Sequence, residues 1–243
     1  MSYCIIIPNY NHTIKLAELI AKLAAFELPV IMINDGSSEA ASKIFFELTE
    51  KFSYLTLIEH QVNQGKGGAV QTGLKAAKEQ GYSHALQVDA DGQHDLNDVE
   101  KLLTESKKHP ASLISGKPIY DESVPKHRYY ARNITHFWVW IETLSFSIKD
   151  TMCGYRVYPL TSTVKLIKEQ RLGLRMDFDI EIMVRLYWRN VDIRFLPTAV
   201  EYPEHGISHF RALEDNLRIS WMHTRLVFGM LLRVPMLIGR KFS

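Results

Sequence analysis

Short apolar runs alternate with helical patterns through the first half of this chain, and this alternation constrains the fold more than any other feature. Runs that are apolar throughout, rather than at every second position, are typical of a parallel sheet that helices cover on both faces. Polar clusters follow the second and the fourth run, and ligands bind at that carboxyl edge of such sheets. The runs are Tyr3–Ile7, Val30–Ile33, Leu55–Ile58, Ala85–Val88 and Leu113–Ile114.

The second half is less regular, and no internal repeat or low-complexity linker marks a domain boundary in it. Helical spacing and aromatic content predict helices there, and an apolar stretch interrupted by Pro197 predicts a strand. The predicted elements are a loop over residues 117–128, helices over 129–147, 178–189 and 211–233, and a strand over Val191–Glu201.

Composition excludes several classes of protein. A chain of 243 residues predicts one large domain or one domain with an appendage. The net charge of +2 is too balanced for a protein dedicated to non-specific nucleic-acid binding. Cys4 and Cys153 are too few for a disulfide framework or a four-ligand zinc site, so both are expected to be reduced thiols. With no signal peptide and no apolar stretch of about 20 residues, we expect a cytoplasmic protein, and contact with a membrane surface stays open.

Two carboxylates, Asp89 and Asp91, stand two residues apart after the fourth apolar run. Such a pair can hold a divalent cation together with a diphosphate, because Mg²⁺ and Mn²⁺ prefer carboxylate oxygen and keep positions open for phosphate. Gln93 would add a neutral oxygen on the same side of an extended segment. The alternative is a solvated turn, since Asp-x-Asp also occurs by chance and has a second copy at Asp177-Phe178-Asp179.

Two further clusters lie at the same predicted edge. Asp35-Gly36-Ser37-Ser38 is typical of a helix N-cap, and one serine can cap while the Asp35 carboxylate accepts hydrogen bonds from a base or a ribose. Gly65-Lys66-Gly67-Gly68 opens a helix, a geometry that suits phosphate. This cluster matches neither the Walker loop nor the dinucleotide fingerprint, which weakens kinase, ATPase and dehydrogenase interpretations.

Basic residues recur in the second half, where most are expected to be solvated. Arg132 differs, because Tyr129, Tyr130, Phe137 and Trp138 surround it in the sequence. Basic and aromatic side chains together suit an amphiphilic partner with an anionic head, or stacked single-stranded nucleic acid, which the balanced charge disfavours. The basic candidates are Lys117, Lys126, Arg128, Arg132, Arg156 and Arg211.

Taken together, these blocks resemble the family 2 glycosyltransferases, inverting enzymes of the GT-A fold, and in particular their dolichyl- or polyprenyl-phosphate sugar synthases. The fold implied is a Rossmann-like three-layer α/β sandwich with a mostly parallel central sheet. The resemblance covers roughly residues 3–205 and rests on Ile5-Ile6-Ile7-Pro8-Asn9-Tyr10-Asn11, Ile33-Asn34-Asp35-Gly36-Ser37-Ser38, Asn63-Gln64-Gly65-Lys66-Gly67-Gly68-Ala69, Val88-Asp89-Ala90-Asp91-Gly92-Gln93-His94, Ser115-Gly116-Lys117, Asp150-Thr151-Met152-Cys153-Gly154-Tyr155-Arg156 and Phe178-Asp179-Ile180-Glu181-Ile182.

The resemblance implies a domain division and a role for each matched residue. Residues 1–205 would form the catalytic domain, with a nucleotide-binding half over about 1–116 and an acceptor half over about 117–205, and residues 206–243 a C-terminal helical extension. The sugar donor would contact Pro8, Tyr10, Asn11, Asp35, Gly65, Lys66, Asp89, Ala90 and Asp91. The metal ion, Mg²⁺ or Mn²⁺, would bind Asp89, Asp91 and Gln93. The acceptor would contact Lys117, Arg128, Arg132, Arg156, His209 and Arg211.

The implied reaction moves a sugar from a UDP- or GDP-linked donor to a lipid-linked phosphate, with inversion at the anomeric carbon. Asp91 would take part in catalysis through the metal ion. A phosphate acceptor is already anionic and needs no base, whereas a hydroxyl acceptor on a glycan or lipid would need one, for which Asp179 and Glu181 are the candidates. A sugar nucleotidyltransferase and a non-catalytic binding module stay open as alternatives from other classes.

The predicted helix over residues 211–233 is basic and amphipathic. Arg211, Arg218 and Arg225 are spaced by seven residues and would form one stripe, while Leu213, Leu217, Trp221, Phe228 and Leu231 occupy other faces. Such a helix can lie on an anionic membrane without crossing it. It can equally pack on the catalytic domain or on a second copy of the chain, and the sequence leaves these three alternatives open.

Overall fold

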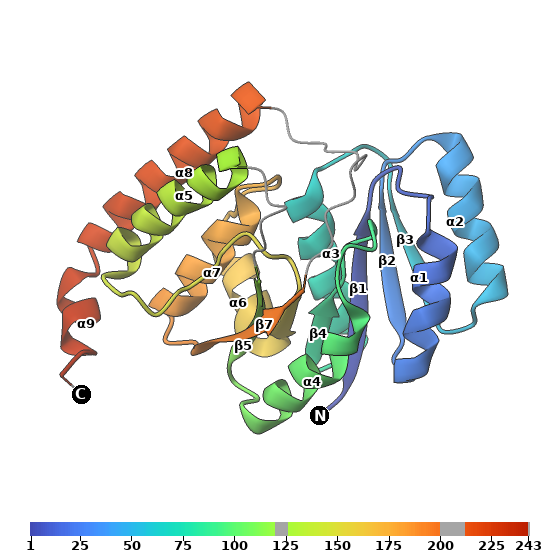
Figure 1. Cartoon of the computed structure of the whole chain (residues 1–243), viewed down its shortest axis with the longest axis horizontal. Coiled ribbons are helices and arrows are strands. Elements are labelled where there is room, and N and C mark those ends of the chain that lie inside the picture. The colour runs from blue at the N-terminus through green and yellow to red at the C-terminus, as the bar shows by residue number, and fades with distance from the viewer. Residues whose placement is uncertain (120–125, 200–211, 243) are drawn as a thin grey trace.

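The computed structural model describes residues 1–119, 126–199 and 212–242, and it shows one central sheet between two layers of helices (Figure 1). Seven strands form the sheet in the order β3-β2-β1-β4-β6-β5-β7. Only β6 runs against the others, because it pairs antiparallel with both β4 and β5. The strands are β1 (Tyr3–Asn9), β2 (Val30–Asp35), β3 (Leu55–His60), β4 (His84–Gln87), β5 (Leu113–Pro118), β6 (Arg156–Pro159) and β7 (Ile193–Thr198).

Side chains of β1 alternate between two apolar cores, one on each face of the sheet. Ile5 and Ile7 pack in the core that α1, α2 and α4 cover, while Cys4 and Ile6 pack in the core that α3, α6 and α7 cover. This arrangement confirms the predicted three-layer α/β sandwich. The helices are α1 (Leu16–Leu23), α2 (Glu39–Lys51), α3 (Lys66–Glu79), α4 (Val99–Lys108), α5 (Lys126–Thr143), α6 (Leu160–Glu169), α7 (Phe178–Trp188), α8 (Ala212–Leu231) and α9 (Val234–Gly239).

The five apolar runs of the first half are all strands, as predicted. The predicted loop over residues 117–128 is too long, because Lys117 and Pro118 belong to β5 and the helix begins at Lys126. Pro197 lies inside β7 rather than interrupting it, which an edge strand allows because its outer side needs no donor. Strand β6 was not predicted. Both cysteines are buried and unbridged, as expected.

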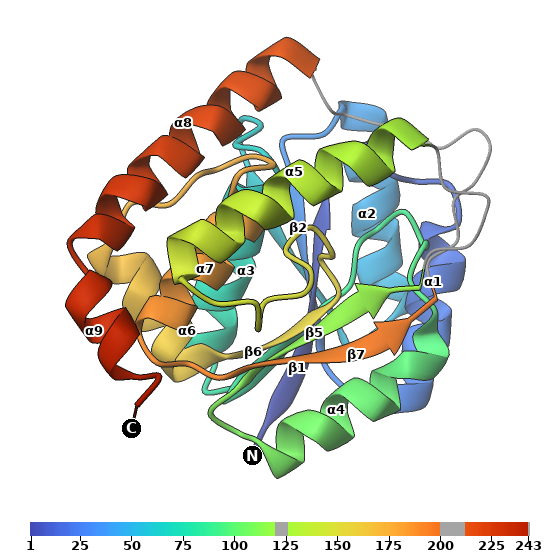
Figure 2. The same cartoon turned by 60° about the vertical axis from the view of Figure 1, so that its left-hand side comes forward.

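Helices α5 and α8 lie side by side outside the layer of α3, α6 and α7 (Figure 2). Met222, Leu226 and Met230 of α8 and Leu237 of α9 are buried in the core on that side. One face of the predicted C-terminal helix therefore packs on the rest of the chain. The division of the chain at residues 116 and 205 stays a prediction.

Candidate active site

The carboxyl ends of β1 and β2 are joined by hydrogen bonds between their loops. The amide of Asn11 donates to Ser37 Oγ (2.9 Å), and the amide of Ser38 donates to Asn11 Oδ1 (2.8 Å). Ser38 Oγ also accepts from the amide of Ala41, so the predicted N-cap of α2 is present. Pro8 is buried in β1 and Tyr10 is half-buried just beyond it. The expected base-pocket residues thus share one edge, where the Asn11 side chain also holds the loop.

Asp35 lies buried at the end of β2, and its carboxylate is used by the protein itself. Oδ1 is 2.7 Å from His60 Nδ1 and accepts from the amide of Gln64 (2.9 Å). Oδ2 accepts from Asn63 Nδ2 (3.0 Å) and from the amide of Gly65 (2.8 Å). This geometry departs from the expected contact with a base or a ribose, because four donors already fill the carboxylate. Asp35 instead positions the loop that leads into α3.

The glycine cluster packs the first turn of α3 against the segment that precedes α7. Gly65 has a φ of 96°, and a Cβ there would lie 2.6 Å from the carbonyl oxygen of Leu174. A Cβ on Gly67 would lie 2.4 Å from Cβ of Phe178. The amide of Gly68 donates to that same Leu174 oxygen (2.9 Å). The amides of Gly65 and Gly68 therefore donate to protein oxygens rather than form an open phosphate cradle, and the close packing brings Lys66 next to α7.

The Lys66 ammonium lies between two carboxylates that come from different parts of the chain. Its Nζ is 2.9 Å from Asp89 Oδ2, just after β4, and 3.5 Å from Asp179 Oδ2, in the first turn of α7. Burial by itself would raise the pKa of Asp89, but the charges of Lys66 and His94 outweigh it and hold that pKa well below its usual range. Burial likewise opposes the charge on Lys66, and the two carboxylates outweigh it and raise the pKa of Lys66.

The Asp89–Asp91 segment forms a tight turn at the rim of this cluster. Asp91 Oδ1 accepts from the amide of Gln93 (3.1 Å), Gly92 has a φ of 69°, and Ala90 is buried. His94 closes the turn, since its Nδ1 accepts from the amide of Asp89 (3.4 Å) and its ring stacks on Tyr155 at 4.5 Å. His94 stood in the matched motif but was not among the predicted site residues.

A divalent cation fits these protein ligands only if a substrate supplies further ligands to the same ion. Within the described residues, no group of three His, Cys, Asp or Glu side chains comes together as metal ligands. The Asp89 and Asp91 carboxylates supply the hard oxygens that Mg²⁺ and Mn²⁺ prefer, and such ions are usually held by one or two carboxylates plus substrate phosphates. The chemistry of the pair thus fits an ion that arrives with a diphosphate.

Gly154 makes room for the cluster on the side of β6. A Cβ at this position would lie 2.6 Å from Gln87 Nε2, 2.9 Å from Lys66 Nζ and 3.0 Å from Asp89 Oδ2. The turn that carries Gly154 is fixed by Asp150, whose Oδ1 accepts from the amides of Met152 and Cys153. Sequence reasoning missed the roles of Gly154 and Asp150, although both stand in the matched block.

Two predicted site residues, Arg156 and Glu181, are buried structural partners. Arg156 is fully buried and donates to the carbonyl oxygens of Asp179 (2.8 Å) and Thr151 (2.7 Å), so it cannot reach an acceptor as expected. Glu181 is also fully buried, accepts from the amide of Gly173 (2.7 Å) and pairs with Arg185 and Arg225. These contacts leave Glu181 unsuited to be a base, and they turn Arg225 toward the domain rather than outward as the predicted stripe required.

The acceptor candidates Lys117 and Arg132 gather on the other side of the 150–154 turn. Arg132 Nε is 2.5 Å from Asp150 Oδ2, and His136 Nε2 is 3.8 Å from the same oxygen. Burial first, and then the positive charges of Arg132 and Lys117, lower the pKa of His136, while Asp150 opposes them. Both basic residues therefore act electrostatically on His136, which was not predicted as a site residue.

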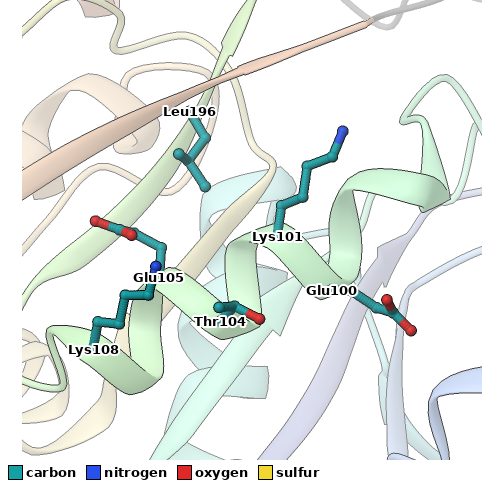
Figure 3. A pocket seen from close by; sticks show the side chains of 6 residues that line it. All are labelled: Glu100, Lys101, Thr104, Glu105, Lys108 and Leu196. Carbon is teal, nitrogen blue, oxygen red and sulfur yellow. The ribbon is translucent and has the colours of Figure 1, made fainter.

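Three acceptor candidates cannot be placed. Arg128 belongs to α5, but its side chain lies outside the described part of the chain, as do His209 and Arg211. An open hollow elsewhere on the surface contains none of the predicted site residues (Figure 3). It is lined by side chains of α4 and β7, namely Glu100, Lys101, Thr104, Glu105, Lys108 and Leu196.

Comparisons with known proteins agree with the fold and with the matched blocks. The sequence model of glycosyl transferase family 2 matches residues 4–170. The dolichyl-phosphate beta-glucosyltransferase of Dictyostelium discoideum is 27% identical over 95% of this chain and 75% of its own. The UDP-N-acetylglucosamine–dolichyl-phosphate N-acetylglucosaminyltransferase of Methanococcus voltae is 24% identical over 94% of this chain and 97% of its own.

Solved structures show the same fold at lower sequence identity. Glucosyl-3-phosphoglycerate synthase of Mycobacterium tuberculosis, solved with Mn²⁺ and uridine-diphosphate-glucose, superposes with a TM-score of 0.66. It is 12% identical, and the match covers 95% of this chain and 78% of that one. At this identity the likeness concerns the arrangement of helices and strands alone.

The four hydrogen bonds of Asp35 predict that Asp35→Asn lowers the free energy of unfolding by about 2–3 kcal/mol, because an amide nitrogen would face backbone donors inside the protein. Denaturant unfolding followed by circular dichroism measures this loss. Glu59→Gln is the matched control, since Glu59 is exposed and, within the part of the chain that the structure describes, its side chain accepts from Asn34 alone. An Asp35→Asn variant with wild-type stability and lost nucleotide binding would instead place Asp35 in direct contact with the base.

Proposed function

The chain belongs to glycosyl transferase family 2, and we propose that it moves a sugar from a UDP- or GDP-linked donor to a phosphate carried by a lipid, with inversion at the anomeric carbon. Similarity to dolichyl-phosphate glycosyltransferases over nearly the whole chain supports the acceptor class. The uridine-diphosphate-glucose bound by a neighbour of the same fold supports the donor class. Membership of the family argues against the nucleotidyltransferase alternative.

The observation that carries the proposal is the Lys66 cation between Asp89 and Asp179 at the carboxyl edge of the sheet. Asp179 is buried and Asp89 is half-buried, and two such carboxylates without a partner would repel each other, so the lysine allows both to be present in one small site. A strand-end carboxylate pair beside a fixed cation suits a diphosphate, which needs positive charge, and a sugar, which needs acceptors for its hydroxyl groups.

On the donor side, the leaving nucleoside diphosphate gains negative charge as the bond to the sugar breaks. A divalent ion, when bound by Asp91 and Asp89 with the diphosphate, would supply Lewis-acid stabilisation of that charge. Lys66 lies beside Asp89 and adds a positive charge that belongs to the chain itself. The packed glycines of α3 hold this ammonium in place before the donor arrives, which is the preorganisation that electrostatic catalysis requires.

On the acceptor side, Lys117 and Arg132 would bind the lipid phosphate. The phosphate oxygen attacks the anomeric carbon from the face opposite to the leaving diphosphate, so the configuration inverts. Because that oxygen is already anionic, no side chain has to remove a proton. A hydroxyl acceptor would need a base, and Asp179 is the remaining candidate since its carboxylate lies in the cluster while Glu181 is fully enclosed.

The outer face of α8 supports contact with a membrane surface. Trp221 and Phe228 are 63% and 66% exposed, and together with their neighbours they form one apolar stripe, since helical residues three, four and seven apart share a face. Beside it, Phe137 and Trp138 of α5 are also exposed. Of the helices that the structure describes, none is long and apolar enough to cross a membrane. We propose that this stripe lies in the interface and brings the site to its lipid; its residues are Leu213, Leu217, Trp221, Phe228 and Leu231 on α8 and Leu232 just after it.

The proposed activity predicts that the purified chain transfers labelled sugar from a UDP- or GDP-sugar to dolichyl phosphate but not to dolichol, because only the phosphate is an anionic nucleophile. Extraction of the lipid and detection of the label measure the transfer, with a panel of UDP-glucose, UDP-N-acetylglucosamine and GDP-mannose. Transfer to dolichol at an equal rate would favour the hydroxyl acceptor. In that case Asp179→Asn should abolish turnover.

The carboxylate pair predicts that nucleotide binding depends on the metal. Asp91→Asn should weaken the affinity of UDP or GDP in Mn²⁺ by at least about tenfold and bring it to the value of the wild type in EDTA. Isothermal calorimetry of both proteins under both conditions measures the affinities. Asp192→Asn is the control, since Asp192 lies just before β7 and its side chain pairs, among the described residues, with Ser112 and Arg194. Equal wild-type affinity in Mn²⁺ and in EDTA would contradict the metal role.

If Lys117 and Arg132 bind the acceptor, a change at Arg132 should weaken binding of the acceptor and leave binding of the nucleotide unchanged. Arg132→Gln should raise the KM for dolichyl phosphate by about tenfold or more while the affinity for the nucleotide stays within about twofold, because one charged hydrogen bond to the phosphate is lost. Steady-state kinetics and nucleotide calorimetry give the two values. Arg189→Gln, which removes a surface ion pair with Glu169, is the control. A parallel loss of both affinities would show that Arg132 serves the donor.

The exposed stripe predicts binding to anionic vesicles at low salt. The full chain should float with phosphatidylglycerol-containing liposomes, and Leu217→Ser with Trp221→Ser should lower the bound fraction several-fold, because two large apolar contacts are removed. Phe46→Ser is the control, since Phe46 is similarly exposed (59%) on α2. A wild-type chain that stays in solution would assign the stripe to contacts with another protein surface.

A further inference from the structure

A closed ring of six polar side chains links the two carboxylates of the site through the protein interior. On its exposed side, Lys66 joins Asp89 to Asp179. On its buried side, three further residues lead from one carboxylate to the other. They are Gln87 of β4 and Arg156 and Tyr158 of β6, and all three are fully buried.

From Asp89 to Arg156 each step is a hydrogen bond between side chains, and the last step joins Arg156 to the main chain of Asp179 by a hydrogen bond and to its carboxylate by an ion pair. Gln87 Nε2 donates to Asp89 Oδ1 (3.0 Å), and Gln87 Oε1 accepts from the Tyr158 hydroxyl (3.2 Å). That hydroxyl accepts from Arg156 Nη1 (3.5 Å). The same Nη1 donates to the carbonyl oxygen of Asp179 (2.8 Å) and lies 3.8 Å from Asp179 Oδ1. The main chain and the carboxylate of Asp179 are therefore both within reach of Arg156.

Sheet geometry explains why these three side chains meet. Gln87 lies opposite Arg156 in the antiparallel register of β4 and β6, so the two side chains point to the same face. Tyr158 is two residues further along β6 and shares that face. The face is the one covered by α3 and α7, which carry Lys66 and Asp179. A single antiparallel strand inserted beside β4 thus creates the link.

A buried arginine, glutamine and tyrosine hydroxyl are costly unless each is hydrogen-bonded, and apolar side chains of similar volume would pack there without that cost. Stability alone therefore does not account for this chain of polar groups. We propose that Gln87, Tyr158 and Arg156 are positioning residues that hold Asp89 and Asp179 at a fixed separation, so that the donor diphosphate and the acceptor side of the site stay aligned. The inference rests on the proposed transfer reaction and assigns residues that support it.

Tyr158→Phe tests the link with the smallest change, because it removes only the hydroxyl that joins Gln87 to Arg156. We expect kcat for sugar transfer to fall about tenfold, since misplacement of a reacting group by about 1 Å can cost about 100-fold and a smaller displacement costs less. The donor KM should change by less than about threefold, because the nucleotide keeps its other contacts. Tyr3→Phe is the matched control: it removes a buried tyrosine hydroxyl that bonds Ser106, at the start of β1 and away from the site.

A structural role alone would lower the melting temperature of both variants and leave kcat per folded molecule unchanged, so equal kcat values for Tyr158→Phe and Tyr3→Phe overturn the proposal.

Gln87→Met provides a second test should Tyr158→Phe not fold. It should likewise lower kcat and leave the donor KM nearly unchanged. If Gln87 and Tyr158 act through one chain of contacts, the Gln87→Met/Tyr158→Phe double variant should have the same kcat as the worse of the two single variants. If the two losses in kcat multiply in the double variant, the residues act independently and the proposal is overturned. A wild-type chain that binds UDP or GDP in calorimetry but transfers no sugar would contradict the proposed function itself.

Discussion

The ion pairs of Lys66 with Asp89 and Asp179 are the interaction on which the rest of the site depends. They join the end of β4, the start of α3 and the start of α7, three elements that are distant in sequence. A lysine can stand there only because the glycines on either side let the first turn of α3 lie against Leu174 and Phe178. Gly154 leaves the space that the ammonium and its partners fill. Backbone packing and charge pairing therefore specify the same arrangement.

Much of the support for this cluster comes from carboxylates that hydrogen-bond the neighbouring backbone. Asp35 fastens the loop before α3 by accepting four hydrogen bonds, and Asp150 fastens the turn before β6 by accepting two from backbone amides. Asp150 also pairs with Arg132, so the turn that borders the donor cluster is held by the residue that orients an acceptor candidate. The Lys66 cluster and the Arg132 ion pair thus both adjoin one short segment, residues 150–154.

Apolar runs at the start of the chain were sufficient to predict the strands of the first half, because burial on both faces of a parallel sheet leaves an unambiguous signal. Strand β6 escaped prediction since it is four residues long and begins with an arginine. The family resemblance implies an acceptor contact for this arginine, and only the neighbouring strands show that it is enclosed. The position of Asp35 at the edge was predicted correctly, but its four donors come from a loop whose path the sequence does not reveal, and its contact with a base or a ribose stays a prediction.

The central claim is that the carboxyl edge of β1, β2 and β4 holds a nucleoside diphosphate beside Lys66, and a crystal structure of the full chain grown with UDP or GDP and Mn²⁺ tests it most directly. Anomalous scattering from manganese locates the ion without reference to the protein. The account predicts an anomalous peak in contact with a carboxylate oxygen of Asp91 or Asp89 and with the diphosphate, with the Lys66 ammonium within hydrogen-bonding distance of a phosphate oxygen. A nucleotide bound elsewhere, or a manganese peak away from both carboxylates, would contradict it.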